Sequence, residues 1–212
     1  MRNLFGVIAI LSLLLLIVEA LHLGVADLHR VGAVLRIESW IKTAKVPTHD
    51  EWLKSHKSLQ TAIKGDPDNP QNMQEIARLL TFNTTKPINE KVESYKKSLE
   101  YLRPMIQLQP ASAYLWARLA RAKFGAKQFD EQTWQAMNRA IKAAPNDYPI
   151  QLTISKLSLL TWPWIPNRWR DTMQKNIQRT LNGEVRGDLI QFAKRNNKLK
   201  LANHLCRKCD VL

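Results

Sequence analysis

The sequence predicts an all-α protein in which helical hairpins stack into a solenoid behind an apolar N-terminal helix. Three observations predict this class. An uncharged, mostly aliphatic run occupies residues 4–18. Two prolines that end helices, Pro110 and Pro145, lie 35 residues apart, close to the period of about 34 residues of helix-turn-helix repeats. A content of 45% hydrophobic and 24% charged residues suits one folded domain plus a targeting segment in 212 residues.

The apolar run predicts an uncleaved membrane anchor. It has 15 residues, fewer than the about 20 that cross a bilayer, but it continues to Val25 if Glu19 lies near an interface. The alternative is a cleaved signal peptide, because Val18-Glu19-Ala20 places small or modest residues where signal peptidase cuts. A mature protein that starts at Leu21 would show that the alternative is correct.

The basic residues on the two sides of the anchor predict opposite orientations. A short N-terminal tail that carries Arg2 and stays in the cytoplasm would send the rest of the chain to the periplasm or cell exterior. Arg30, Arg36 and Lys42 lie on the other side and favour the reverse. We favour export, with a single membrane pass and a periplasmic soluble part.

The anchor helix is predicted to continue beyond the bilayer. No proline interrupts residues 26–45, where apolar residues recur at helical spacing until Pro47. Thr48 and Glu51 then fit a capping box, in which each side chain satisfies a free backbone N–H of the next helix. The predicted buried stripe of that helix consists of Trp52, Leu59, Ala62 and Ile63.

Residues that follow the prolines recur at fixed offsets. A bulky residue, a large aliphatic residue and an alanine form each set: Trp116, Leu119 and Ala120 after Pro110, and Met73, Ile76 and Ala77 after Pro67. In a tetratricopeptide (TPR) unit such residues pack helix A against helix B, and a proline ends helix B. The sequence therefore predicts a TPR-like α-helical solenoid. At the corresponding offset from Pro145 stands the polar Gln151, which departs from the pattern.

The unit that ends at Pro110 is 43 residues long and is predicted to carry an insertion at residues 82–86, which are rich in turn formers. The next helix is expected to open near Pro87, because a proline is tolerated in a first turn. Pro104 is expected to cause a kink or an early end near Arg103, because inside a helix it removes a hydrogen bond and clashes with the preceding turn.

Four polar residues are predicted to line a partner-binding groove. On the A helix at residues 70–81, Gln74 and Arg78 project away from the apolar stripe, and Arg118 and Arg121 occupy comparable positions in the following unit. Guanidinium groups bind carboxylates in a forked geometry, so this groove would suit an acidic peptide or an anionic glycan. The alternative is that the four residues only solvate an exposed face.

Prolines frame a group of tryptophans at the end of the helix that begins near Tyr148. Trp162, Trp164 and Trp169 are candidates for glycan contact, because aromatic rings stack on sugar faces. The commoner arrangement is packing between successive helices, since each ring buries a large area.

The final segment, residues 167–212, is predicted to be a basic helical cap. It holds 11 Lys and Arg against 4 Asp and Glu, within a total formal charge of +14. Its helices are expected to break at Asn182-Gly183 and near Asn196-Asn197. The basic surface suits an anionic partner, although a solvated helix face would carry the same charge.

No motif in the sequence predicts catalysis, a cofactor or a metal. The chain lacks a Ser/His/Asp order, a phosphate-cradling glycine loop and paired carboxylates. His49 and His56 are expected at the surface, since no third ligand follows at zinc-like spacing. Cys206 and Cys209 form a C-x-x-C that lacks the histidine needed for haem attachment, and we predict a local disulfide or free thiols. We therefore expect a protein that is not an enzyme.

The order of these features resembles the small TPR-like proteins of bacterial exopolysaccharide operons, the VpsP family. The resemblance covers the anchor, the first unit from Trp52 to Pro70, residues 114–123 (YLWARLARAK), the unit at 129–149 and the helix at Trp162. It implies a membrane-associated accessory role in polysaccharide biosynthesis or export at the bacterial inner membrane. The implied partners are proteins of the assembly machinery, and the resemblance supplies no catalytic residues.

Together these features divide the chain into an anchor and juxtamembrane helix at 1–46, TPR-like repeats at 47–166 and the basic cap at 167–212. The predicted function is a non-catalytic adaptor that organises protein partners at the membrane. The alternative function is direct binding of an anionic glycan by the tryptophans and the basic cap. Nucleic acid is not an expected partner.

Overall fold

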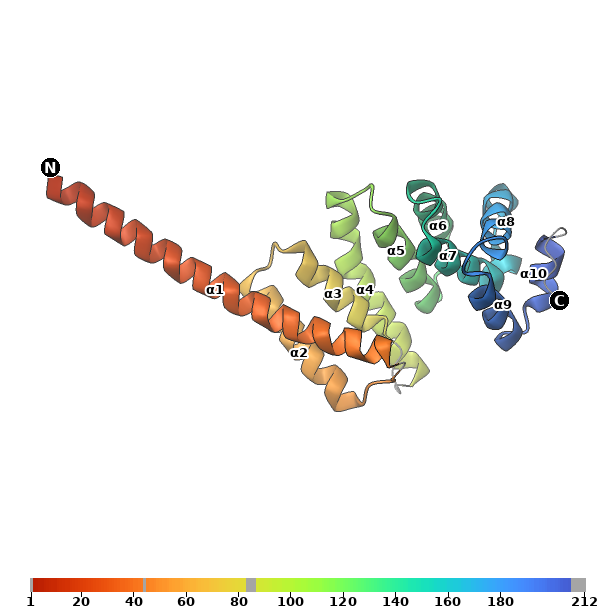
Figure 1. Ribbon diagram of the computed structural model, residues 1–212, viewed down its shortest axis with the longest axis horizontal. Helices are drawn as coiled ribbons and strands as arrows, with labels where there is room; N and C mark the ends of the chain where they lie inside the picture. Colours follow the sequence, from red (N-terminus) through yellow and green to blue (C-terminus); the bar gives the residue numbers. More distant parts are fainter. Residues whose placement is uncertain (1, 44, 83–86, 207–212) are drawn as a thin grey trace. The chain divides into compact units, whose positions relative to one another are not determined.

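The computed structural model describes residues 2–43, 45–82 and 87–206. Within these ranges the chain forms ten α-helices and one 3-10 helix and no β-strand (Figure 1). The predicted all-α class is therefore confirmed. Packing divides the chain into two compact units, Met1–Glu90 and Lys91–Leu212. The three segments predicted from the sequence rest on other criteria and stay predictions.

The first unit contains α1 (Arg2–Lys42), α2 (His49–Gly65) and α3 (Pro70–Leu80). The helix α4 (Ile88–Leu108) begins at the boundary between the units. The second unit continues with α5 (Ala113–Gly125), α6 (Glu131–Ala143), α7 (Tyr148–Thr161), η1 (Trp162–Trp164), α8 (Asn167–Leu181), α9 (Arg186–Arg195) and α10 (Leu199–Leu205).

The long helix α1 has two parts with different surroundings. Its C-terminal part packs against α2 and α3 and buries Ala26, Ala33, Ile37 and Trp40. Its N-terminal part extends away from α2 and α3 (Figure 1), and the large apolar side chains described there are exposed. The stretch Ile10–Lys42 is long and apolar enough to cross a membrane, and its most apolar window of 18 residues has a mean hydropathy of 2.0. This finding suits an anchor and a signal sequence alike.

The helix α2 begins at the predicted capping box. The Thr48 hydroxyl accepts a hydrogen bond from the backbone N–H of Glu51 at 3.3 Å, and the Thr48 N–H donates to the Glu51 carboxylate at 2.9 Å. A hydrogen bond from Lys45 at 2.8 Å, together with those from Thr48, lowers the pKa of Glu51. Of the predicted stripe, Trp52, Leu59 and Ala62 are buried, and Ile63 is half-buried.

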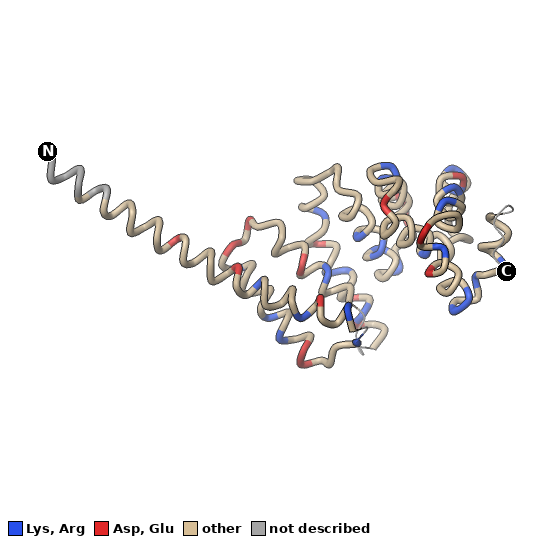
Figure 2. Tube along the Cα trace, in the orientation of Figure 1, with Lys and Arg blue, Asp and Glu red and all other residues tan. Residues whose placement is uncertain are grey.

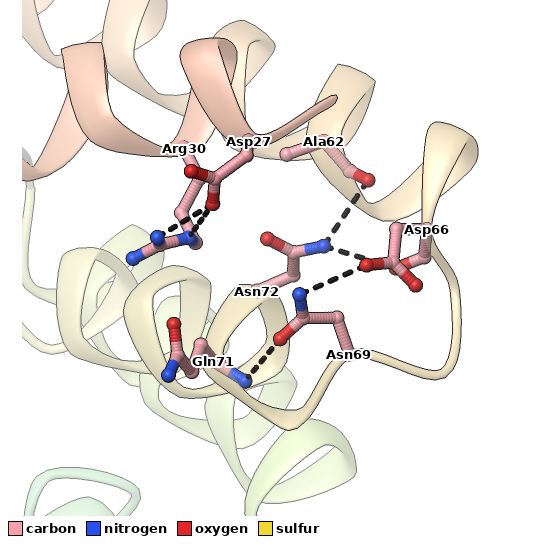
Figure 3. A network of polar contacts seen from close by, with 7 residues as sticks. All are labelled: Asp27, Arg30, Ala62, Asp66, Asn69, Gln71 and Asn72. Carbon is pink, nitrogen blue, oxygen red and sulfur yellow. Dashed lines mark hydrogen bonds and ion pairs between the residues drawn. The ribbon is translucent and has the colours of Figure 1, made fainter. Parts of the chain in front are cut away.

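Side-chain hydrogen bonds close the turn between α2 and α3 (Figure 3). Asn72, buried on α3, donates from Nδ2 to the backbone carbonyls of Asp66 at 2.9 Å and Ala62 at 3.2 Å. Asn69 caps α3 by accepting from the backbone N–H of Gln71 at 3.0 Å. The end of one helix and the start of the next are therefore fixed to each other, at a place where backbone groups lack helical partners.

The second unit closes two of its turns with the same kind of bond. Trp116 donates from Nε1 to the carbonyl of Pro110, and Gln151 donates from Nε2 to the carbonyl of Pro145, each at 2.7 Å. Both pairs are six residues apart, as are Asn72 and Asp66 in the first unit. Gln151 departs from the repeat only in side-chain type, because its amide N–H makes the bond that the indole N–H makes one repeat earlier.

Helix α4 continues through Pro104 to Leu108, so the alternative of an early end near Arg103 is wrong. A proline inside a helix costs about 3 kcal/mol. Burial of Leu102 and Met105, on either side of the proline, contributes about 1.5 to 3 kcal/mol for each side chain and offsets this cost.

The helices α8 and α9 end where the sequence predicts. Helix α8 stops at Leu181 and α9 at Arg195, each followed by an asparagine that the sequence marks as a break. Side chains of α7 to α10 share one apolar core cluster, which includes Leu159, Ile177, Leu189 and Leu205. The C-terminal helices therefore cover apolar surface of α7 and α8.

Candidate functional site

A cleft of about 690 Å³ lies within the second unit, between α8 and α10. Helix α8 contributes Arg170, Gln174 and Gln178. These residues are spaced by four, which places them on one face of a helix. The opposite wall includes His204 and Leu205 of α10.

Two amides of α8 hold α10 in place at the cleft. Gln174 and Gln178 both donate from Nε2 to the backbone carbonyl of Leu205, at 3.0 and 2.9 Å. This carbonyl lies at the C-terminal end of α10, where helical partners are missing. The cleft therefore has a wall that is fixed by hydrogen bonds, which suits a preformed binding site.

The guanidinium of Arg170 is also fixed at the cleft. Its Nε donates to the backbone carbonyl of Ile165 at 3.0 Å, and its Cζ lies 5.9 Å from the ring centroid of Trp162. Trp162 lines the same cleft. An arginine held in this way offers its terminal amino groups to a carboxylate with little loss of conformational entropy.

The described residues that line the cleft include Arg170 and His204 and no Asp or Glu. The second unit as a whole holds 22 Lys and Arg against 9 Asp and Glu. Such a surface attracts anions, and amide, guanidinium and indole N–H groups are donors suited to carboxylates. The arrangement can bind an acidic group.

The residues of the predicted groove belong to different compact units. Gln74 and Arg78 lie on α3 in the first unit, and Arg118 and Arg121 lie on α5 in the second. Arg78 forms ion pairs with Glu38 at 2.5 Å and Glu75 at 3.2 Å. Its guanidinium thus joins α3 to α1, and the shared groove stays a prediction.

The three predicted glycan-contacting tryptophans have different partners. Trp162 lines the cleft beside Arg170. Trp164 is 57% exposed and stacks on Phe129, with ring centroids 5.2 Å apart and an interplanar angle of 5°. Trp169 donates from Nε1 to the carboxylate of Glu131 at 3.4 Å. The three rings therefore contact different groups, and the glycan site stays a prediction.

An ion pair near Trp169 joins α8 to α6. Arg168 donates to the carboxylate of Glu131, and this hydrogen bond lowers the pKa of Glu131.

Cys206 is buried and lines the cleft, while Cys209 lies outside the described residues. The predicted disulfide consequently stays a prediction.

Reasoning from the sequence missed the cleft. The spacing by four of Arg170, Gln174 and Gln178 is present in the sequence and could have indicated a polar face of α8. No local signal places His204 opposite that face, because the turn of the chain at α9 brings it there. Among the described residues, no group of three or more His, Cys, Asp or Glu could hold a metal ion.

No protein-family model matches the chain, and no curated protein matches it. Among solved structures, the chain is similar to the crystal structure of a thermophilic TPR protein in Thermus thermophilus, with a TM-score of 0.54. The similarity covers 84% of this chain and 87% of that chain, at 15% sequence identity. It confirms the predicted TPR-like helical fold.

Proposed function

We propose that this chain is a non-catalytic, membrane-anchored adaptor that binds proteins of a bacterial exopolysaccharide assembly. The observation that carries the binding role is the fixed, anion-attracting cleft between α8 and α10 in a TPR-like fold. The setting follows from the resemblance to the VpsP family. The apolar part of α1 would hold the chain at the inner membrane, with the soluble part in the periplasm.

The cleft suits an acidic segment of a partner protein. The terminal amino groups of Arg170 would bind a carboxylate, and the Trp162 ring beside it would cover the apolar part of the same segment. His204 is exposed at the opposite wall and would meet the bound segment from α10.

Photo-crosslinking in cells that produce the polymer tests this function. A photoreactive residue at His204, in the cleft, should form products with proteins of the polymer assembly. The same residue at Lys175, whose side chain is 69% exposed on α8, is the matched control and should not. Equal products from both positions would contradict binding in the cleft.

Deletion of the gene tests the role in polysaccharide assembly. It should abolish or alter the polymer while the purified glycosyltransferases stay active, and an unchanged polymer would contradict that role.

A second candidate function is direct binding of an anionic glycan. It is favoured by the exposed Trp164 ring, which Phe129 holds in a stacked position. Titration of the purified chain with an acidic oligosaccharide at increasing salt tests it. A charge-led mode predicts an affinity that falls as salt rises, whereas an affinity insensitive to salt would contradict it.

A further inference from the structure

One face of α1 is apolar along its length and is not covered by the described part of this chain. Buried residues of α1, such as Ala33 and Ile37, face α2 and α3. On the other side of the same turns, Leu28 is 72% and Leu35 is 65% exposed. Both leucines lie beyond residue 25, so they belong to the part of α1 that continues past the predicted anchor.

The uncovered face repeats every seven residues. Leucines stand at 14, 21, 28 and 35. Ile10 and Ile17 each stand four residues before one of these leucines, and Val31 stands three residues after Leu28. This alternation of three and four is the a/d pattern of a parallel coiled coil, with leucine at a and a β-branched residue at d. The pattern is sustained over almost four heptads, and its last heptad lies where α1 also packs against α2.

Position 24 interrupts the d positions with a glycine. A Cβ added at Gly24 would meet no atom within 4 Å, so no described group of this chain requires the absence of a side chain there. A glycine inside a helix costs about 1 kcal/mol relative to alanine. Small residues on apolar helices allow a neighbouring helix to approach closely, and Ala20 precedes Gly24 by four residues.

We propose that α1 associates in parallel with α1 of further copies of this chain through this heptad face. The proposal rests on the proposed anchor, because copies inserted by the same helix share one orientation and one depth. The same heptad of each copy then lies at the same depth, so the helices are already in register. Leucine at a with a β-branched residue at d is a pattern that favours three or four strands over two.

Area and charge both agree with a second copy as the occupant. The seven large side chains of the face expose roughly 700 Å² per copy, comparable with the about 800 Å² that each partner buries in a standard interface. Charge does not oppose the contact. Asp27, beside the face, is neutralised by Arg30 of its own chain at 2.6 Å.

Cysteine cross-linking of the full chain in native membranes tests the proposal. Leu28→Cys and Leu35→Cys should yield disulfide-linked dimers on oxidation. His29→Cys and Leu15→Cys are the controls, since His29 is exposed and Leu15 is as exposed as Leu28, at 72%, but both lie off the face. We expect about tenfold more dimer from the face positions, because a disulfide forms only between close Cβ atoms. The unsubstituted chain, with its own two cysteines, sets the background.

Equal yields at face and control positions would overturn the proposal. So would background yields at every position while the intact chain stays in the membrane fraction, which would show that lipid covers the face. Recovery of the mature chain without residues 1–20 would instead contradict the anchor itself, and N-terminal sequencing distinguishes that failure.

A second measurement does not depend on disulfides. The double variant Leu28→Ala/Leu35→Ala should lower the mass of the detergent-solubilised particle to that of a monomer. Its helix content, measured by far-UV circular dichroism, should stay unchanged, because these side chains are mostly exposed within the chain. Leu15→Ala is the control and should keep the mass of the unsubstituted chain. An unchanged mass for the double variant would contradict the proposal.

Discussion

The two compact units differ most in charge. Met1–Glu90 holds 10 Lys and Arg against 9 Asp and Glu, whereas Lys91–Leu212 holds 22 against 9. Almost the whole excess of +14 therefore lies in the second unit. Residues 3–26 of the sequence contain a single charged residue, Glu19. Figure 2 shows few charged residues along the N-terminal part of α1 that is not drawn in grey. The long apolar stretch and the excess of positive charge thus belong to different parts of the molecule.

This difference teaches that net charge has to be assigned to a folded unit before it is interpreted. The total of +14 suits anionic lipid as well as an acidic partner. The first unit is nearly neutral and carries the apolar helix, so its contact with a membrane would be hydrophobic. The second unit carries the charge and the cleft, so an acidic partner is expected there.

The largest expected effect is on membrane attachment. Deletion of residues 2–25 should move the chain completely from the membrane fraction to the soluble fraction, because these residues supply the apolar length that a bilayer requires. Fractionation followed by a high-salt wash measures this. Leu15→Ala serves as the control and should stay in the membrane. If the truncated chain stays membrane-bound until salt is raised, the basic second unit binds lipid and the comparison fails.

The next effect concerns the cleft. Arg170→Ala in the full chain should weaken binding of an oligo-glutamate probe about tenfold, since hydrogen bonds to charged groups contribute about 1.5 to 3 kcal/mol. Lys54→Ala in the first unit removes an exposed positive charge and should leave the affinity unchanged. Titration calorimetry in detergent solution provides the measurement. Equal losses from both variants would mean that the probe responds to net charge only.

The third effect concerns the bonds that close the turns. Gln151→Leu and Asn72→Leu each remove the donor to a backbone carbonyl and should destabilise by about 1 to 3 kcal/mol. If the units fold separately, hydrogen exchange should rise in the second unit for Gln151→Leu and in the first unit for Asn72→Leu. A rise of the same size in both units for either variant would show that the chain unfolds as one unit.

The smallest effect is a loss of stability in acid, confined to the second unit. Burial acts to raise the pKa of Asp130, but hydrogen bonds from Lys123 at 2.8 Å and from Thr133 outweigh it and lower the pKa. The stabilisation is therefore complete above the ordinary value of 3.8 and is lost as pH falls through the lower value of the folded chain.

Because the Asp130 side chain is 53% exposed, this contribution is on the order of 1 kcal/mol after solvent screening. Asp130→Asn should flatten the decline of stability between about pH 5 and pH 2, measured by denaturant unfolding at each pH. An unchanged pH profile would show that the pair of Lys123 and Asp130 does not control acid stability.

Local features of the fold were predictable from the sequence. The capping box at Thr48 and the breaks after α8 and α9 depend on a few adjacent residues, and the structure confirms them. The TPR-like packing was predictable from the offsets after the prolines. The passage of α4 through Pro104 was not predictable, because it depends on burial of Leu102 and Met105 against other helices.

The candidate site was harder to predict than the fold. The sequence did not indicate that Arg78 pairs with Glu38, which lies 40 residues earlier on α1, and its place in a binding groove stays a prediction. In the sequence Gln151 departs from the repeat, whereas in the structure it donates to the carbonyl of Pro145. A polar side chain has several possible partners: Gln151 bonds to a carbonyl six residues away, whereas Arg78 pairs with a residue on another helix.

By itself the sequence determined the helical class, the repeat punctuation and the apolar character of α1, because hydrophobic period, capping and proline act over a few residues. Tertiary structure alone decided which polar side chains form hydrogen bonds or ion pairs within the molecule and which lie together in the cleft. It also decided which face of α1 is left uncovered, since α2 and α3 cover only one side. Burial and pairing depend on what packs against a residue, and that is set by segments far away in the chain.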